Sequence, residues 1–344
     1  REHTRKKRRE HKSVLVAYAA PKPLLEAADF LHRQQRAKSG EEKMVFEATE
    51  EALQVLNSSL SHLKWRLKSP AKRRLEIDVL ALLTGMRPVI MVDYGGKMPE
   101  LQQHLCSLIK HCHQESAVFE CLRVMVVDDM IYLIHIKGLA EYARTSLNSE
   151  AEFYFVNLEQ EPLKMVSQKQ DCPLGADFLR LQRLFSQFFP LDEAKDDALL
   201  PDVKDTVANV EPSTSLSAGH IDLSSCMQET QITVPTLNGW LLGYPVVYLF
   251  GKEFISEAIC NLSTKNLHLF RILVRRGNGA SSKGSQPEEL MSFSVPYELS
   301  MRGRKEPWAE AFLERLQFKW QNCKQTWVFL EMEVEECYPQ AIVL

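Results

Sequence analysis

The chain has 344 residues, of which 45% are hydrophobic and 25% charged, and this composition is typical of a globular protein that buries a substantial core. Its formal net charge of −3 at pH 7 is too small to indicate a polyanion partner for the chain as a whole. No run approaches the 18 consecutive apolar residues of a spanning helix, so we expect no membrane span.

A basic segment opens the chain. Residues Arg1–Lys12 carry seven Lys or Arg against two Glu and contain nothing apolar to bury, which predicts a solvated arm. A functional arm would be a nuclear localisation signal or a nucleic-acid-binding segment, and the alternative is a solvated tail without a function. A short helix is expected at Leu24–Arg36. Residues 1–43 are therefore predicted to combine a disordered basic arm with this helix and to be only partly disordered. Met44 is a hypothetical alternative start, because a clean helical pattern begins there.

Apolar periodicity runs from residue 44 to residue 191, the expected first half of the core. Helical spacing predicts helices at Ala48–Leu67, Lys72–Leu83, Leu101–Ile109, Gly138–Arg144 and Asp177–Phe189. Short apolar, often β-branched runs predict strands at Val89–Val92, Leu122–Val127, Met130–Ile136 and Phe153–Leu158. Asp128–Asp129 has the right length for a hairpin loop, although it lacks the preferred glycine.

The composition changes from Asp192 to Glu229, where acidic residues give way to serine-rich sequence with few large apolar side chains. Such a segment cannot offset its ordering entropy, so residues 192–230 are predicted to be a disordered insert. Periodicity returns over residues 231–344, the expected second half of the core. Strands are predicted there at Ile232–Val234, Val246–Phe250, Leu267–Val274, Met291–Tyr297 and Trp327–Val334, and helices at Glu253–Leu262 and Pro307–Trp320.

Helices and strands are mixed in both halves without strict alternation. This predicts an α+β fold, with a mixed β-sheet covered by helices and a single core interrupted by the insert. The alternative is two smaller α+β domains joined by Asp192–Glu229.

One candidate ligand site follows a predicted buried strand. Asp93, Gly95 and Gly96 lie between that strand and a helix, where an acid can accept hydrogen bonds from ribose hydroxyls and glycines let a backbone approach a cofactor. The position suits a nucleotide or adenosyl ligand. The dinucleotide fingerprint Gly-x-Gly-x-x-Gly is absent, however, and the acid-x-Gly-x-Gly pattern would need glycine at Lys97. A tight turn is the competing interpretation.

Histidines and cysteines crowd one predicted helix, at His104, Cys106, His111, Cys112 and His113. Metal ligands on a helix usually stand at i and i+4, and this spacing from His104 falls on a leucine. We therefore predict a half-exposed helix with outward histidines and no metal site.

The glycine-rich loop Gly277–Ser285 has some likeness to a phosphate-binding loop, but no glycine precedes its lysine and it joins strand to strand. We expect a hairpin connection. The Gly-x-Ser-x-Gly elbow of the hydrolases does not occur, and no local pairing indicates a nucleophile. The cofactor, if there is one, stays unknown.

The segment Val234–Tyr248, VPTLNGWLLGYPVVY, is the most distinctive part of the chain. It resembles the uncharacterised animal family of the human chromosome 1 open reading frame 74 product, and the resemblance runs from about Met44 to the C-terminus. That family has no assigned activity or catalytic residues, so the resemblance implies none here. Asn238–Gly239 within the segment predicts a hairpin turn. Trp240 and Tyr244 are expected to be core anchors, with an exposed aromatic contact surface as the alternative.

Eight scattered cysteines without Cys-x-x-Cys spacing predict free thiols in a reducing compartment, the cytoplasm or the nucleus. With no complete catalytic constellation, the leading hypothesis is a non-enzymatic interaction protein with an unidentified protein partner. The first alternative is an enzyme that binds a nucleotide or adenosyl ligand near Asp93. The second is a nucleic-acid tether acting through the basic arm.

Overall fold

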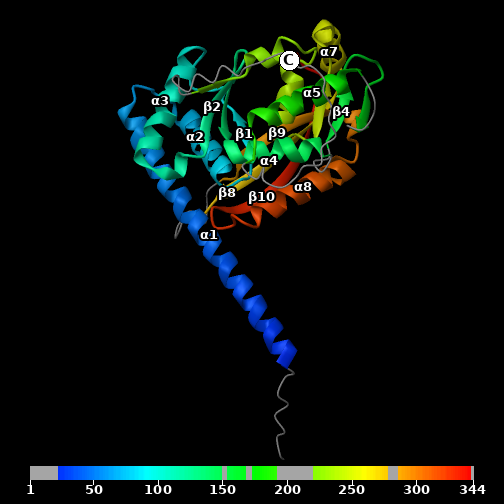
Figure 1. Cartoon of the computed structure of the whole chain (residues 1–344). Helices are drawn as coiled ribbons and strands as arrows, with labels where there is room; N and C mark the ends of the chain where they lie inside the picture. Colours follow the sequence, from blue (N-terminus) through cyan, green and yellow to red (C-terminus); the bar gives the residue numbers. More distant parts are fainter. Residues whose placement is uncertain (1–21, 149–152, 168–172, 192–219, 278–285, 342–344) are drawn as a thin grey trace, which may run out of the picture. The chain divides into compact units, whose positions relative to one another are not determined.

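The computed structural model describes residues 22–148, 153–167, 173–191, 220–277 and 286–341, with side chains from Gly40 onward except at 41 and 173. Within these ranges the chain forms three β-sheets and a set of helices (Figure 1). The helices are α1 (Lys22–His62), α2 (Ser69–Leu83), α3 (Glu100–Glu115), α4 (Ile136–Leu147), α5 (Pro173–Phe188), α6 (Val234–Leu241), α7 (Ile255–Ser263) and α8 (Pro307–Trp320). The strands are β1 (Val89–Met91), β2 (Leu122–Val127), β3 (Met130–His135), β4 (Tyr154–Asn157), β5 (Lys164–Ser167), β6 (His220–Asp222), β7 (Val246–Leu249), β8 (Leu267–Arg276), β9 (Glu288–Pro296) and β10 (Trp327–Cys337). The predicted α+β class is confirmed.

Contacts divide the chain into two units, Arg1–Glu41 and Glu42–Leu344, and all three sheets belong to the second. The helices expected at Leu24–Arg36 and Ala48–Leu67 are one helix, α1, which continues through Ser39–Gly40 and ends at His62. A single glycine costs a helix only about 1 kcal/mol, and the helix-forming residues around it offset that cost.

The first sheet has the strand order β1-β3-β2-β6. Strands β2 and β3 form the predicted hairpin, and Asp128, at φ 52°, opens its two-residue loop in place of glycine. Strand β6 pairs parallel with β2, and Cys226 and Met227 just after it are buried. The disordered insert was therefore predicted to end too late. Residues 220–229 are ordered because they pair with β2 and bury side chains, and local composition does not reveal either contact. Residues 192–219 lie outside the described residues.

The second sheet has the order β5-β4-β7, with β4 parallel to β7. Strand β5 was not predicted, since its residues are only partly buried and lack a clear alternation. Both β2–β6 and β4–β7 pair strands that precede residues 192–219 with strands that follow them. The two halves of the chain thus share sheets, as expected for a single core.

The third sheet, β10-β8-β9, is antiparallel throughout and lies against α8 (Figure 1). Aromatic rings fill the space between them. The ring of Phe270 on β8 lies 5.0 Å from that of Trp308 on α8, and Phe293 on β9 meets Phe312 on α8 edge to face at 5.6 Å. The loop predicted at Gly277–Ser285 joins β8 to β9, and its residues 278–285 lie outside the described residues.

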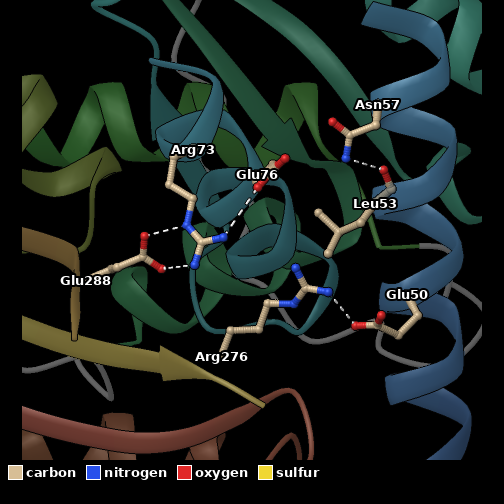
Figure 2. Close-up of polar contacts among 7 residues, drawn as sticks. All are labelled: Glu50, Leu53, Asn57, Arg73, Glu76, Arg276 and Glu288. Atoms are coloured by element: carbon tan, nitrogen blue, oxygen red, sulfur yellow. Dashed lines mark hydrogen bonds and ion pairs between the residues drawn. The ribbon is translucent and has the colours of Figure 1, made fainter. Parts of the chain in front are cut away.

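Ion pairs connect the first two helices to this third sheet (Figure 2). Arg73 on α2 binds both oxygens of Glu288 on β9, at 2.5 and 2.7 Å, and this contact raises the pKa of Arg73. Arg276 on β8 binds Glu50 on α1 at 2.8 Å. A guanidinium held by two parallel hydrogen bonds has a defined orientation, so the Arg73–Glu288 pair sets the position of α2 and β9 relative to each other.

The most distinctive sequence segment forms a helix, and the hairpin predicted at Asn238–Gly239 is wrong. Thr233 caps the N-terminus of α6, with its hydroxyl accepting a hydrogen bond from Thr236 N at 3.5 Å. Gly243, at φ 73°, ends the helix, because its N–H donates to Trp240 O at 2.8 Å while that of Tyr244 donates to Gly239 O at 2.9 Å. These capping signals outweigh the turn preference of an Asn-Gly pair.

Gly239 instead allows α6 to approach the second sheet closely. A Cβ atom at this position would lie 3.1 Å from the side chain of Val247 on β7. The strand predicted at Ile232–Val234 is also wrong, since Ile232 forms only an isolated bridge with Gly251 before α6 begins. The expectation for Trp240 is confirmed: this residue is fully buried.

Candidate functional site

The residues predicted as a ligand site lie in the turn that follows β1. Asp93, Gly95 and Gly96 are exposed. Gly95 adopts φ 84°, and its carbonyl accepts a hydrogen bond from Trp65 Nε1 at 2.8 Å. The three residues lie close together because they are neighbours in the sequence. Their backbone packs against the chain just after α1.

Gly95→Ala should destabilise the protein by about 1–3 kcal/mol, because a side chain here is strained by the positive φ and also collides with its neighbours. The new Cβ would lie 2.6 Å from Leu67 Cδ2 and 2.9 Å from Trp65 Cζ2. Urea unfolding measures the loss. Gly85→Ala is the matched control, since Gly85 has φ 69° but no atom within 4 Å of an added Cβ. Equal losses for the two variants would show that the contact with Trp65 does not matter.

The histidine and cysteine helix, α3, packs against α1 and the chain just after it, so its half-buried histidines do not point outward as predicted. His104 stacks on Trp65, and His111 Nδ1 lies 2.9 Å from Ser59 Oγ. Burial raises the pKa of Cys106 to about 11, so little of this side chain is in the reactive thiolate form at neutral pH. Within the described ranges no group of His, Cys, Asp and Glu could hold a metal ion. The described cysteines are free thiols, and Cys172 lies outside the described residues.

A cavity of about 630 Å³ lies at the other end of β1, where Arg87 and Pro88 precede the strand. Its wall is formed by the turn after α2, α4 from its N-cap to Thr145, Phe153 just before β4, the turn after α6, Met291 on β9 and the C-terminal half of α8. Helices α4 and α8 are the green and orange helices of Figure 1. The volume falls within the range of small-molecule sites. Asp93, Gly95 and Gly96 are not among the residues that line it.

Arg87 is the most unusual residue on this wall, because only 5% of its surface is exposed. Its NH1 group donates to the carbonyl of Leu290 at 3.1 Å, while its Nε has no hydrogen-bond partner in the described part of the chain. The nearby acid Asp78 is already engaged by Arg74 and by the hydroxyl of Tyr94. Burial lowers the pKa of Arg87, and the nearby Tyr244, Asp78 and Glu289 oppose that fall.

Positive charge dominates the cavity. Arg87, Lys137, Arg315 and Lys319 line it against one carboxylate, Glu141. Solvent reaches Lys137, Glu141 and Lys319, which places these three at the mouth. Protein atoms surround the Lys319 ammonium closely enough that burial lowers its pKa, and the neighbouring Arg315 and Arg87 lower it further. Like charges held this close repel one another unless an anion lies between them.

The N-terminus of α4 also faces this cavity, through Lys137 and Gly138 in its first turn. His135 caps the helix, and its Nδ1 accepts a hydrogen bond from the N–H of Gly138 at 3.0 Å. The proton of the neutral ring therefore lies on Nε2. Burial lowers the pKa of His135, which favours this neutral form. The helix dipole adds positive potential to that of the four cations.

A protein-family model matches the part of the chain that contains this cavity. A model described as a domain of unknown function, DUF4504, matches residues 57–344. The chain belongs to this family. No curated protein and no solved structure matches the chain. The DUF4504 match includes all three sheets and the whole wall of the cavity.

Sequence patterns in this DUF4504 domain did not indicate the cationic residues of the cavity. Arg315 and Lys319 stand four residues apart on α8, a spacing that signals a shared helix face but looks like any solvated face. Arg87 offered the better signal, since only Pro88 separates it from the buried apolar strand β1. None of these residues forms a local motif, because they come together only when α2, α4 and α8 pack.

Proposed function

We propose that this protein binds a small anionic ligand in the cavity between α4 and α8. The carrying observation is Arg87, a buried guanidinium on the cavity wall that forms no ion pair within the described residues. A buried charge is costly unless it is paired and hydrogen-bonded. Within the described residues Arg87 forms no ion pair with a carboxylate. An anionic ligand would supply the missing counter-charge.

The surroundings of Arg87 support the same ligand chemistry. Arg315 and Lys319 add charge from α8, and the first turn of α4 adds its dipole. Phosphate is the anion whose charge and oxygen geometry match an arginine fork. The N-terminus of α4 adds its dipole, since the N–H groups of Ile136 and Gly138 already donate to Cys121 O and His135 Nδ1. The proposal concerns binding and includes no catalytic step.

Inorganic phosphate and pyrophosphate are the first probes. Each should raise the melting temperature of the full chain, with a stabilisation of about 2.7 kcal/mol at a hundredfold excess over the dissociation constant. Lys319→Met, which alters a solvent-accessible side chain, should weaken pyrophosphate binding at least about tenfold, a factor that corresponds to about 1.4 kcal/mol. Arg87→Met should weaken it further, and urea unfolding checks that both variants fold.

Two control variants test whether anion binding depends on this cavity. Lys110→Met removes an exposed positive charge from α3, away from the cavity, and should leave the affinity unchanged. Asp93→Asn tests the alternative of an enzyme with a nucleotide or adenosyl ligand near Asp93. If Asp93→Asn abolishes binding and Lys319→Met does not, the alternative replaces our proposal. If no anion shifts the melting temperature, the proposal fails.

The other hypotheses from the sequence stay proposals of their own. They are the non-enzymatic interaction protein in the cytoplasm or nucleus, and the nucleic-acid tether through Arg1–Lys12, which lies outside the described residues. No described helix is long and apolar enough to cross a membrane. The resemblance of Val234–Tyr248 supports placing the chain in the family of the chromosome 1 open reading frame 74 product, which adds no activity.

A further inference from the structure

The part of the cavity wall that is not charged is strongly apolar. It includes Phe153, Leu242, Met291, Phe312 and Leu316, each at most 5% exposed. A site for an inorganic anion alone would need only the cations. Apolar surface that faces an open cavity of 630 Å³ gains stability when an apolar group replaces the water.

The uncharged side chains on the wall with polar groups are His135, Tyr142, Thr145 and Tyr244, and the first three already form hydrogen bonds within the chain. The hydroxyl of Tyr142 already donates to the carbonyl of Trp240 at 2.7 Å, so this side chain presents chiefly its ring. The carboxylate of Glu141 stands at the solvent-exposed mouth. Ligand hydroxyls need acceptors, and a wall rich in leucine, methionine and phenylalanine supplies few. The body of the ligand should therefore be apolar rather than a ribose.

The charge of the head group follows from the cations. Four cationic side chains and a helix N-terminus line the cavity against one carboxylate, Glu141, and this lining favours a dianionic head group over a single carboxylate. We infer that the ligand is a phosphomonoester with an apolar body, its dianionic head at Arg87, Lys319 and the first turn of α4, and its body against Phe153, Met291 and Phe312. This inference rests on the proposed function and names the ligand class of the same cavity.

A series of soluble alkyl phosphates tests the inference. Ethyl, butyl and hexyl phosphate are titrated into the full chain by calorimetry, with hexanoate and hexanol as partners that lack the dianion. Affinity should rise about threefold to fourfold for each added methylene, the factor expected for full burial of a methylene group. Hexanoate should bind at least about tenfold more weakly than hexyl phosphate, and hexanol should show no saturable binding.

Two variants locate the head and the body. Lys319→Met should weaken all three alkyl phosphates by the same factor and leave the gain per methylene unchanged. Met291→Gln, of nearly equal volume, should leave ethyl phosphate unaffected and reduce the gain for hexyl phosphate. Lys110→Met, outside the cavity, should change neither, and urea unfolding confirms that each variant is folded.

A lipid head group could present the same chemistry as a free phosphomonoester. Phosphatidylcholine vesicles with and without phosphatidate distinguish the two sources by sedimentation. We expect no more binding to the phosphatidate vesicles than to phosphatidylcholine alone. Binding that requires the vesicle and is not reproduced by hexyl phosphate would overturn the inference.

The failures of the two proposals can be told apart. If phosphate and pyrophosphate bind but the alkyl series is flat, or if hexanoate equals hexyl phosphate, the ligand class is wrong and the anion site stands. If no anion binds at all, both fail.

Discussion

Asp78→Ala should lower the free energy of unfolding by about 3–5 kcal/mol, the loss expected when one partner of a buried ion pair is removed. Asp78 on α2 is fully buried. Its Oδ2 accepts hydrogen bonds from Tyr94 at 2.7 Å and from Arg74 Nε at 3.3 Å, and Arg74 NH2 lies 3.0 Å from Oδ1. Alanine would leave the arginine charge and the tyrosine hydroxyl without this acceptor. Urea unfolding of the two proteins at pH 7 measures the difference.

Asp78→Asn is the matched control, because asparagine keeps an acceptor for Tyr94 and has nearly the same volume. Burial raises the pKa of Asp78, and Arg74 and Tyr94 oppose that rise. The site therefore holds the charged form at a considerable cost, so loss of the charge alone should cost clearly less than loss of the whole group. An alanine variant within about 1 kcal/mol of wild type would show that this network does not stabilise the fold.

Trp240→Ala should cost about 3–5 kcal/mol, as expected for deleting a large aromatic side chain from a core. Trp240 is fully buried on α6 among three other rings. Phe178 and Phe185 on α5 meet it edge to face at 5.8 and 5.4 Å, and Tyr142 on α4 stacks on it at 5.8 Å. The indole N–H has no hydrogen-bond partner in the described part of the chain, so the loss comes from packing alone.

Phe318→Ala provides the comparison, since Phe318 on α8 is 71% exposed and removing it should change stability by less than about 0.5 kcal/mol. Trp240→Phe should recover part of the loss because it keeps edge-to-face contacts. The same denaturant series measures all three variants. If Trp240→Ala and Phe318→Ala cost the same, the aromatic cluster around α6 does not stabilise the core.

The site and the core are joined through Tyr142 and Arg87. Tyr142 stacks on Trp240 and also lines the cavity. Arg87 lines the cavity and shares the carbonyl of Leu290 with Arg74, the partner of Asp78. Both large-effect variants could therefore disturb ligand binding as well as stability, which is why the binding tests use Lys319→Met, at the solvent-exposed mouth.

The amino-acid sequence alone determined the fold class and most of the secondary structure. Local patterns were enough where one segment decides its own conformation, as in the buried run of β1, the Asp128–Asp129 hairpin and the amphipathic α8. They failed at Asn238–Gly239, where two opposing local signals competed, and at β6, whose three residues form a strand only because β2 lies beside them.

Only the tertiary structure reveals the cavity in which we propose that a ligand binds. Asp93, Gly95 and Gly96 stand next to one another in the sequence, so a motif could be looked for and was found incomplete. Arg87 and Lys319 are distant in the sequence, and their shared cavity exists because α8 packs on the third sheet while α4 follows β3. Local composition could not reveal this cavity, since only the folded structure shows that Arg87 is buried on its wall without an ion pair among the described residues.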